Sequence, residues 1–550
     1  MKRCYLLIAL FVLSTLVGHT QNNDVTGIPF SFSHPNISYS IDKIDLPHVD
    51  VSSLMAEDAK NVKNGEPLRI GAVHKVGLNF DNCGRTDILP DGAKLWRVAL
   101  HSENAYSMAV SFTQFNIPEG ASFYIYNNDR SEIAGTYSNS DIQPNGILQT
   151  DYIAGDEIVL EYYEPADVRF HGSMEISRVG HIYRDIFSAT DDSKGNVDDA
   201  QDCHFHAVCP QGREWHDQIN SVVHITITAV DGTYSCSGAL INNVRMDKTP
   251  YILSANHCLK GLDCGFSFLF FYQRLRCDGS GIPPLKKMAG GEIKAYVSEN
   301  TDAGINTSSD FLLLKLTRDL ASKPWSDSLY FAGWDATGTS SIGLAVHHPA
   351  GAYKRFSFPK TVTTYSFNTR YWNVSWYTNP SKGCTEQGSS GSPLFNQNKL
   401  IIGDLSNGSS ACDYNGTDNY GKLSYSWTNN NNSDNSKKLK PWLDPDNTGR
   451  LTLPGMSFDG TVDVTTYTSN TQFFNVAPNP STGVVTIQGN FEDVEGQCLV
   501  YNATGQLVST FNVQLSPSFT VNFNQLPNGI YFLEINGNEQ VYRSKMIIAK

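Results

Sequence analysis

The sequence predicts an all-β chain made of several domains, on three observations. Its 550 residues exceed what one hydrophobic core organises, so about three or four domains are expected. Charged residues make up only 17% of the chain, whereas glycine and aromatic residues are abundant, a composition typical of extracellular β-rich proteins. Short apolar runs alternate with polar residues and are separated by glycine- and asparagine-rich turns, which is the pattern of β-strands.

The first 20 residues have the layout of a secretory signal peptide. Lys2 and Arg3 precede an apolar run over 5–17, and polar residues follow from His19 onward. A membrane-spanning helix needs about 20 apolar residues, so this run is too short to span a bilayer. We therefore expect residues 1–20 to be removed, no stable membrane span, and a secreted or cell-surface protein.

Residues 21–194 are predicted to contain a β-sandwich-like domain over about 66–165. Strand-like runs at 95–100, 107–115, 121–127 and 156–164 are separated by turns, and regular spacing of short strands is typical of such sandwiches. A carbohydrate-binding or adhesive sandwich is an open alternative.

A charged segment over 191–202, DDSKGNVDDAQD, has no apolar residues to bury beyond a single valine and an alanine. Accessible segments of this kind are preferred sites of proteolysis. Lys194 is its basic residue, and Arg184 is the alternative just upstream.

The region over 195–458 is predicted to form a double β-barrel. Strand-like runs lie at 222–230, 312–316, 372–377 and 399–408, and residues 437–443 are expected to form a short helix. The asparagine-rich stretch 429–436 is interpreted as a surface loop. A linker over 459–472 is then expected before a final compact β-module over 473–550.

The stretch GCTEQGSSGSP over 383–393 indicates a nucleophilic serine. A serine becomes a nucleophile when a base takes its proton and fixed N–H groups receive the charge on the attacked carbonyl. Gly388 allows a tight turn in which its own N–H and that of Ser390 point at one oxygen. We therefore expect Ser390 to be the nucleophile, with the N–H groups of Gly388 and Ser390 as the oxyanion hole.

Two further segments supply the partners that such a serine requires. His257 lies in YILSANHC after an apolar strand, and Asp310 begins the apolar run of SDFLLLKL. Their order along the chain, His257, Asp310 and then Ser390, is the order found in the chymotrypsin class of serine triads. Together they predict a catalytic triad, although each residue alone has an ordinary structural interpretation.

The central region resembles the lysyl endopeptidase branch of the trypsin-like serine proteases. The resemblance rests on CHFHAVCPQG, CSGALINN, LSANHC, SDFLLLKL, FAGWDAT, HHP, TEQGSSGSP and TDNYGKLSYSW, which span most of 198–458. It implies a chymotrypsin-like fold, peptide-bond hydrolysis through an acyl-enzyme and no cofactor. Residues 21–194 resemble the propeptide of this family, so Lys194 becomes a candidate site of self-processing.

The C-terminal module resembles the sorting domain of proteins exported by the type IX secretion system. FNVAPNPSTG, LPNGIYFLEI and the basic end near Lys545 and Lys550 carry this resemblance. It implies an Ig-like β-sandwich, with a small adhesive domain as the alternative, and makes the type IX secretion machinery a partner.

Eight of the 11 cysteines lie in the central region, which suits a disulfide-bonded secreted protein. The family resemblance implies the pairs Cys203 with Cys412, Cys209 with Cys277, and Cys236 with Cys258. Cys264 and Cys384 are then left over, and a fourth bridge between them is a guess.

The resemblance also places the substrate pocket. Lysyl endopeptidases carry a pocket aspartate after the serine, and TDNYG puts Asp418 there, whereas the trypsin position six residues before the serine is Cys384. Ser406, in SNG, is assigned to the substrate-binding edge. The expected tryptophan near 361–370 is not evident, so we predict cleavage after Lys with Arg left open.

Other functions are less well supported. The segment CHFHAVC invites a zinc site, but Cys203, His204, His206 and Cys209 are too closely spaced for the usual motif, so no metal is expected. The formal charge of −14 argues against nucleic-acid partners, and a monomer is expected. A surface-displayed adhesion protein with an inactive protease-like domain is the remaining alternative.

Overall fold

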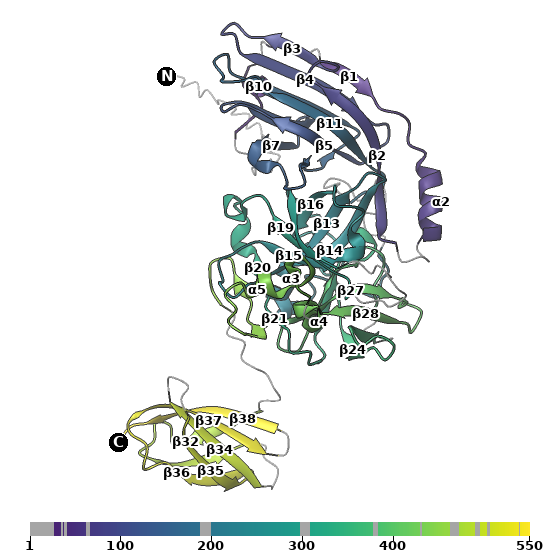
Figure 1. The fold of residues 1–550 in the computed structure, drawn as a ribbon. Coiled ribbons are helices and arrows are strands. Elements are labelled where there is room, and N and C mark those ends of the chain that lie inside the picture. The colour runs from purple at the N-terminus through teal and green to yellow at the C-terminus, as the bar shows by residue number, and fades with distance from the viewer. Residues whose placement is uncertain are drawn as a thin grey trace, which may run out of the picture. The chain divides into compact units, whose positions relative to one another are not determined.

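The computed structural model describes residues 27–34, 37, 41–61, 66–186, 200–297, 309–377, 383–429, 432–462, 472–489, 495–502, 507–537 and 540–550. The chain divides into two compact units, Met1–Asp463 and Val464–Lys550 (Figure 1). The predicted signal peptide and Lys194 lie outside the described residues. Among those that are described, no helix is long and apolar enough to cross a membrane.

The N-terminal part of the first unit contributes a six-stranded sheet in the order β1-β4-β10-β6-β7, with β3 paired to β4. Strand β1 pairs parallel with β4, and the other neighbours are antiparallel. The strands are β1 (Asp42–Asp45), β3 (Arg85–Ile88), β4 (Lys94–His101), β6 (Ser122–Asn127), β7 (Ile133–Tyr137) and β10 (Glu157–Glu164).

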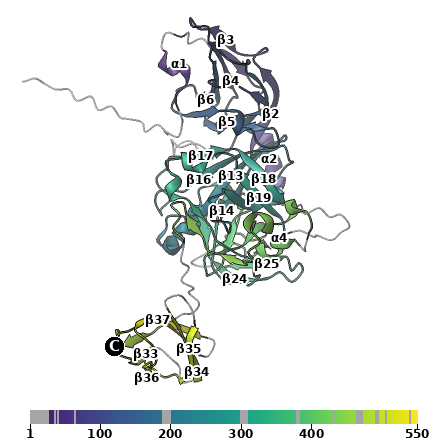
Figure 2. The same ribbon diagram turned by 60° about the vertical axis from the view of Figure 1, so that its left-hand side comes forward.

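A twelve-stranded sheet joins the N-terminal part to the central region. Its main path is β17-β16-β13-β14-β2-β11-β5-β8, with β9 on β5, and β15 and β18 both paired to β19. Figures 1 and 2 both show β13, β14, β16 and β19 gathered side by side. The strands are β2 (Leu68–Asn79), β5 (Ser107–Asn116), β8 (Leu148–Gln149), β9 (Ile153–Ala154), β11 (Ser173–Ile182), β13 (Val222–Thr228), β14 (Thr233–Ile241), β15 (Tyr251–Ala255), β16 (Gly265–Phe270), β17 (Lys286–Ala289), β18 (Gly291–Tyr296) and β19 (Phe311–Leu316).

A ten-stranded sheet completes the central region, in the order β12-β23-β22-β26-β27-β28-β25-β24 with β21 and β29 attached, and β20 pairs separately with β30. The strands are β12 (Phe205–His206), β20 (Tyr330–Phe331), β21 (Trp334–Asp335), β22 (Leu344–His347), β23 (Arg355–Ser357), β24 (Pro359–Thr364), β25 (Tyr371–Trp376), β26 (Pro393–Phe395), β27 (Ile401–Gly408), β28 (Thr417–Lys422), β29 (Thr452–Leu453) and β30 (Met456–Ser457).

The helices described in the first unit are short. They are α1 (Phe30–Ser33), α2 (Val51–Asn61), α3 (His216–Ser221), α4 (Leu423–Thr428) and α5 (Lys440–Leu443). The helix expected over 437–443 is present as α5, which begins three residues later because Pro441 suits the first turn of a helix. Helix α4 was not expected, since its sequence LSYSWT follows the β28 strand without a break.

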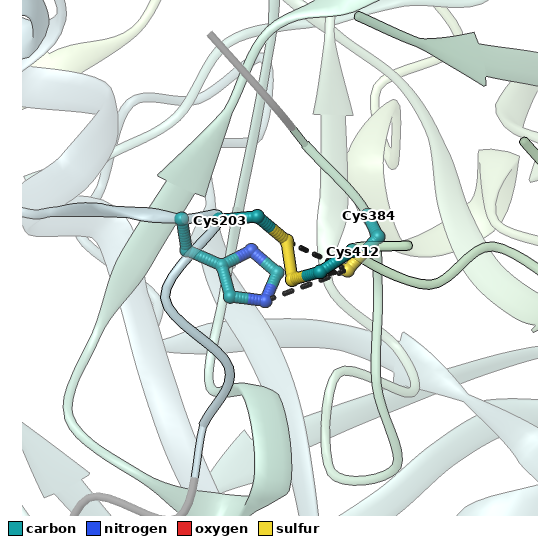
Figure 3. A group of neighbouring side chains, drawn as sticks. Cys203, Cys384 and Cys412 are labelled. Atoms are coloured by element: carbon teal, nitrogen blue, oxygen red, sulfur yellow. Dashed lines mark hydrogen bonds between the residues drawn. A yellow bond between two sulfur atoms is a disulfide. The ribbon is translucent and has the colours of Figure 1, made fainter. Parts of the chain in front are cut away.

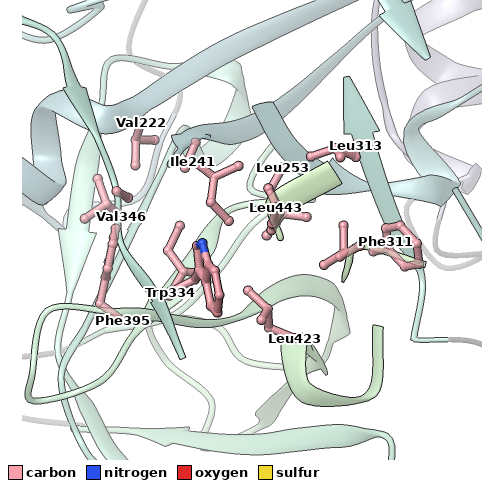
Figure 4. Close-up of a cluster of buried hydrophobic side chains, with 14 of the residues drawn as sticks. Val222, Ile241, Leu253, Phe311, Leu313, Trp334, Val346, Phe395, Leu423 and Leu443 are labelled. Atoms are coloured by element: carbon pink, nitrogen blue, oxygen red, sulfur yellow. The ribbon is translucent and has the colours of Figure 1, made fainter. Parts of the chain in front are cut away.

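The largest apolar core of the central region lies where its two sheets meet (Figure 4). Ile241 and Leu253 come from the twelve-stranded sheet, Trp334 and Phe395 from the ten-stranded sheet, and all four are fully buried or nearly so. Burial of such side chains contributes about 1.5–3 kcal/mol each. This core holds the two sheets together and thereby fixes the loops that carry the predicted triad.

The N-terminal part packs on the central region through a second apolar cluster and through strand pairing. Gly71 on β2 pairs with Thr233 on β14, and Arg69 pairs with Tyr234. The cluster combines Leu68, Ile70, Ala109, Tyr152, Ile182 and Ile186 with Leu269, Tyr272, Leu285 and Tyr353. The strands predicted over 66–165 are present and surround an apolar core whose buried members lie between Cys83 and Val179, while β2, β5 and β11 also continue the sheet of the central region.

The second unit contains two antiparallel-rich sheets around its own core. One has the order β31-β38-β37-β34-β35 and the other β32-β33-β36. The strands are β31 (Gln472–Phe473), β32 (Asn475–Ala477), β33 (Val484–Gln488), β34 (Glu495–Asn502), β35 (Leu507–Gln514), β36 (Ser518–Asn522), β37 (Gly529–Gly537) and β38 (Gln540–Ile548). The prediction that the chain is mostly β is thus confirmed in both units.

Candidate active site

His257 and Asp310 are held together by two hydrogen bonds. The Nδ1 of His257 lies 2.7 Å from Oδ2 of Asp310, and the backbone N–H of His257 donates to Oδ1 at 2.9 Å. Asp310 is fully buried, whereas the His257 side chain is 17% exposed. A carboxylate that accepts at Nδ1 fixes the proton there, so that Nε2 carries the lone pair that can act as a base.

Both residues lie at the ends of paired strands. Strand β15 ends at Ala255 and η4 (Asn256–Cys258) follows, while β19 begins at Phe311 directly after Asp310. Ala255 pairs with Phe311, so the two strand ends meet. Asp310 adopts a φ of 61°, a conformation that costs a non-glycine residue energy and that clusters at functional sites.

Ser406 supports the buried carboxylate from the other sheet. Its hydroxyl donates to Oδ2 of Asp310 at 2.7 Å. The sequence predicts that Ser406 lies at the substrate-binding edge, and this stays a prediction; the structure adds the contact of its side chain with Asp310. This contact links β27 of the ten-stranded sheet to β19 of the twelve-stranded sheet.

Asp404 is a second buried acid that the sequence analysis did not single out. It lies two residues before Ser406 on β27, is fully buried, and neither of its carboxyl oxygens has a hydrogen-bond partner among the described residues. Burial, followed by the charge of Asp310, raises the pKa of Asp404 well above its usual value. Burial and the neighbouring charge of Asp310 therefore both disfavour the charged form of Asp404.

The turn that carries Ser390 requires two glycines. Gly388 has a φ of 86°, and a Cβ there would lie 2.6 Å from the backbone nitrogen of Gly351. Gly391 has a φ of 79°, and a Cβ there would lie 2.5 Å from the carbonyl oxygen of Ser237. A side chain at Gly388 would clash with the segment that follows β22, and one at Gly391 would clash with β14 of the twelve-stranded sheet.

Contacts with the strands beside His257 hold the backbone of this turn. The N–H of Ser237 donates to the carbonyl oxygen of Ser390 at 2.8 Å, and the hydroxyl of Ser237 donates to that of Gly388 at 2.9 Å. The Sγ of Cys258, the neighbour of His257, lies 4.0 Å from the Ser390 carbonyl oxygen. The turn is thus fixed against the strand end that carries His257.

The N–H groups assigned to the oxyanion hole are not used by the fold. Within the described part of the chain, no carbonyl accepts the backbone N–H of Gly388 or of Ser390. By contrast, Ser389 is engaged, because its hydroxyl lies 2.7 Å from Nδ1 of His347 and accepts the N–H of Glu386 at 3.2 Å. Ser389 is fully buried, which agrees with a structural role.

Asp418, the predicted pocket acid, is buried and bound by four donors. Its Oδ2 accepts Nε1–H of Trp376 at 2.7 Å and the hydroxyls of Thr385 and Ser410 at 2.8 and 2.6 Å. Its Oδ1 accepts only the backbone N–H of Ser410, at 3.1 Å. Burial raises the pKa of Asp418, and the hydrogen bonds from Ser410, Thr385 and Trp376 oppose that rise.

Trp376 is a pocket residue that the sequence analysis missed. A tryptophan was sought near 361–370, but the indole that touches Asp418 comes from the end of β25. The β25–β28 register pairs Val374 with Asp418, so Trp376 extends past the acid. The contact between Trp376 and Asp418 depends on the pairing of β25 with β28, and no local sequence pattern indicates that pairing.

Disulfides join Cys203 to Cys412, Cys209 to Cys277, and Cys236 to Cys258. Cys264 and Cys384 are both free and buried, so the guessed bridge between them is wrong. Cys264 contacts the carbonyl of Gly261, whereas Cys384 contacts the Cys203–Cys412 disulfide.

The sequence analysis also missed a cluster of sulfur and imidazole groups that includes this disulfide. The ligand atoms of Cys203, His204, Cys384 and Cys412 all lie within 4.8 Å of one another (Figure 3). The zinc interpretation considered His206 and Cys209 instead, because the second pair of residues comes from loops about 180 and 208 residues further along the chain.

The N-terminal part also reaches the Ser390 turn. The side chain of Gln387 donates to the carbonyl oxygen of Glu66 at 3.1 Å, and Lys260 forms an ion pair with Glu66. Arg184, the alternative processing residue, is tied to Asp58 at 3.3 Å and to the carbonyl of Arg69 at 3.1 Å. Processing at Arg184 would therefore require these contacts to open.

Two protein-family models match parts of the chain. Residues 197–421 match the lysyl endopeptidase C-terminal domain, and residues 475–549 match the secretion system C-terminal sorting domain. A lysyl endopeptidase from Pseudomonas aeruginosa is 24% identical over 392 residues, which cover 66% of this chain and 79% of the relative.

Similar solved structures include two proteases. The thermostable serine protease AL20 from an extremophilic microorganism is 14% identical, covering 38% of this chain and 92% of its own, with a TM-score of 0.29. A Glu endopeptidase structure is 20% identical, covering 37% and 85%, with a TM-score of 0.25. The assignment therefore rests on the two family matches.

Proposed function

Because the chain carries a lysyl endopeptidase C-terminal domain followed by a secretion system C-terminal sorting domain, we propose that it is an exported serine endopeptidase that cleaves on the carboxyl side of lysine. The observation that carries the proposal is the buried pair of Asp310 and His257, fixed beside the Ser390 turn. The two meeting sheets are, in this proposal, the two barrels of a chymotrypsin-like fold.

In the proposed mechanism, Ser390 Oγ attacks the scissile carbonyl carbon and His257 Nε2 takes its proton. The N–H groups of Gly388 and Ser390 bind the oxyanion, since no carbonyl of the described residues accepts either of them. His257 then gives the proton to the leaving amine, and a water molecule releases the acyl group by the same steps. Asp310 keeps the His257 tautomer fixed and stabilises the imidazolium.

The surroundings of Asp418 favour lysine over arginine. An arginine fork binds a carboxylate through both oxygens, whereas an ammonium needs only one. Oδ2 of Asp418 already accepts from three side chains, and only Oδ1 has free capacity. Gly408 lies against Oδ1, because a Cβ there would be 1.9 Å away, so a larger residue at this position would block that oxygen.

Digestion of an unfolded protein mixture by the purified full-length enzyme tests the mechanism. We expect peptides ending in lysine, and a loss on the order of 10⁶ in kcat for Ser390→Ala. Ser389→Ala is the matched neighbour and should retain labelling by an active-site serine reagent. A wild-type protein that neither cleaves nor reacts with the reagent would contradict the proposal and favour the adhesion alternative.

Paired substrates that differ only in Lys or Arg before the scissile bond test the pocket. Asp418→Asn should raise KM for the lysine substrate and erase the preference, because the buried countercharge is gone. Asp413→Asn, an exposed acid in the neighbouring loop, is the control and should change neither. Equal cleavage after Lys and Arg by the wild type would keep the mechanism and remove the lysine restriction.

Self-processing at Lys194 is also part of the proposal. It is supported by the match to this family, which begins at residue 197. N-terminal sequencing should find Gly195 as the first residue of the processed wild type, with no processing in Ser390→Ala. A processed Lys194→Gln protein with an unchanged new N-terminus would contradict this site.

A further inference from the structure

Cys384 is a buried thiol in contact with a disulfide. Its Sγ lies 3.3 Å from Sγ of Cys203 and 3.9 Å from Sγ of Cys412, the two partners of that disulfide (Figure 3). Cys384 and Cys203 are buried, and the side chain of Cys384 is fully so. Three sulfur atoms that can form only one disulfide therefore share one site.

Cys384 lies close to both cysteines of the disulfide, so Cys203 has two neighbouring sulfur atoms with which it could be paired. In the same part of the fold, Nε2 of His204 lies 3.6 Å from Sγ of Cys384 and 2.7 Å from Oε1 of Glu386. Thiol–disulfide exchange requires a thiolate attacking a disulfide sulfur, and this arrangement supplies both sulfur groups without any added reagent.

We propose that Cys203, Cys384 and Cys412 form a thiol–disulfide exchange site in which one disulfide moves between two pairings. The Cys384 thiol loses its proton to solvent, and the thiolate attacks Sγ of Cys203. A bond forms between Cys384 and Cys203 as the bond between Cys203 and Cys412 breaks. Cys412 leaves as a thiolate and takes up a proton, so no electrons are gained or lost overall.

The surroundings of Cys384 make this exchange slow in the closed protein. Burial, and then the negative charges of Glu386, Asp418 and Asp413, raise the pKa of the Cys384 thiol far above its usual value. The thiol is therefore protonated, and only a thiolate attacks. Exchange should accelerate as pH rises and when the site opens to water.

The two pairings differ in which loop beside Asp418 is linked to Cys203, the loop that contains Cys412 or the loop that contains Cys384. Cys384 precedes Thr385, and Cys412 follows Ser410 by two residues, and both Thr385 and Ser410 donate to Asp418. The Cys203–Cys384 pairing would release the loop of Ser410 and weaken its hold on Asp418. This consequence for lysine cleavage rests on the proposed function, whereas the exchange itself does not.

The same side chains offer a Cys₃His ligand set to zinc. The distances of 3.6 and 3.9 Å from Cys384 to His204 and Cys412 resemble the ligand spacing of about 3.6–3.8 Å that follows from the usual Zn–N and Zn–S bond lengths. Zinc binding would need the disulfide reduced by an added thiol, whereas exchange needs no reductant. The disulfide between Cys203 and Cys412 therefore favours exchange.

Disulfide mapping of the full-length Ser390→Ala protein tests the proposal. The protein is incubated without metal ions from pH 7 to pH 9, quenched with acid, alkylated and mapped by mass spectrometry without reduction. We expect peptides linked through Cys203–Cys412 and through Cys203–Cys384, the second appearing faster at higher pH. Because Ser390→Ala lacks the proposed nucleophile, the result is independent of proteolytic activity.

Three variants made in the same background sharpen the test. Cys384→Ser should lose the Cys203–Cys384 peptide. Cys412→Ser leaves Cys203 and Cys384 as thiols, so oxidised glutathione is added as the oxidant, and Cys203 should then be linked to Cys384. Cys264→Ser removes a buried free thiol away from this disulfide and should leave the map unchanged.

The proposal is overturned if the Cys203–Cys412 peptide is the sole product at every pH while Cys384 is fully alkylated after unfolding. It is equally overturned if Cys203 and Cys384 both stay free in Cys412→Ser after oxidation by added oxidised glutathione, or if the isolated protein holds zinc with all three thiols reduced. Exchange in a chain whose wild type cleaves nothing would leave this inference standing and remove the proposed function.

Discussion

At the scale of single residues, the Ser406 hydroxyl is the contact whose loss should affect catalysis while leaving the substrate pocket intact. It donates to the buried Asp310 carboxylate at 2.7 Å. A hydrogen bond to a charged group is worth about 1.5 kcal/mol or more, and about 1.4 kcal/mol corresponds to a tenfold change in rate.

We therefore expect Ser406→Ala to lower kcat about tenfold with little change in KM, because Asp310 loses a donor but Asp418 does not. Steady-state kinetics on a lysine substrate measure this, with Ser409→Ala on the exposed side of the same loop as the control. A rise in KM at constant kcat would instead assign Ser406 to substrate binding.

The pH dependence of substrate binding should report on Asp418. Its pKa is raised by burial, so it is charged above that raised value and neutral below it. Binding of a lysine side chain should therefore weaken as pH falls through this window, seen as a rise in KM. Asp418→Asn has no charge to lose, and its KM should be flat over the same pH range; a parallel rise in both proteins would place the titration elsewhere.

Local patterns predicted the residues that chemistry requires and missed those that the tertiary structure recruits. His257, Asp310 and the glycines around Ser390 stand in short motifs whose conformational demands are readable along the chain. Trp376 reaches Asp418 through strand pairing. Asp404 and Cys384 acquire their properties from burial, which depends on the whole fold.

At the scale of elements, the sequence predicted the strands better than the sheets. The runs expected at 222–230, 312–316, 372–377 and 399–408 are present as β13, β19, β25 and β27. Sheet membership differs, because β2 leaves the strands near it in sequence and pairs with β14. Whether a strand forms depends on the local alternation of apolar and polar residues. Which strand it pairs with depends on which other strands offer an edge for pairing in the folded chain.

The junction between β2 and the central region should be sensitive to a single side chain. Ile70 is fully buried in the cluster formed with Tyr272 and Tyr353. Ile70→Ala should lower the free energy of unfolding by about 2–5 kcal/mol through the cavity that it leaves. Thermal unfolding of the unprocessed chain measures this, and Ile88→Ala, at a residue that is 66% exposed, should leave Tm nearly unchanged.

At the scale of the whole molecule, the two compact units should unfold independently. Each has its own buried core, one around Trp334 and Phe395 and the other around Val500 and Ile535. Calorimetry of the full chain should resolve two transitions. Deleting residues 464–550 should remove one transition and leave the Tm of the other unchanged, whereas a shift in the remaining Tm would show that the units stabilise each other.

The pairing of β2 with β14 has a consequence for a protein that loses its N-terminal part. Strand β14 pairs with β2 over Thr233, Tyr234 and Ser235, and the departure of β2 would leave the β14 backbone groups that point toward it without partners. An edge strand with unpaired backbone groups can pair with a strand of another chain. Processed molecules stored at high concentration would therefore be prone to associate edge to edge. Under the proposed processing at Lys194, the time of cleavage would decide both when the protein becomes active and when it begins to associate with its own copies.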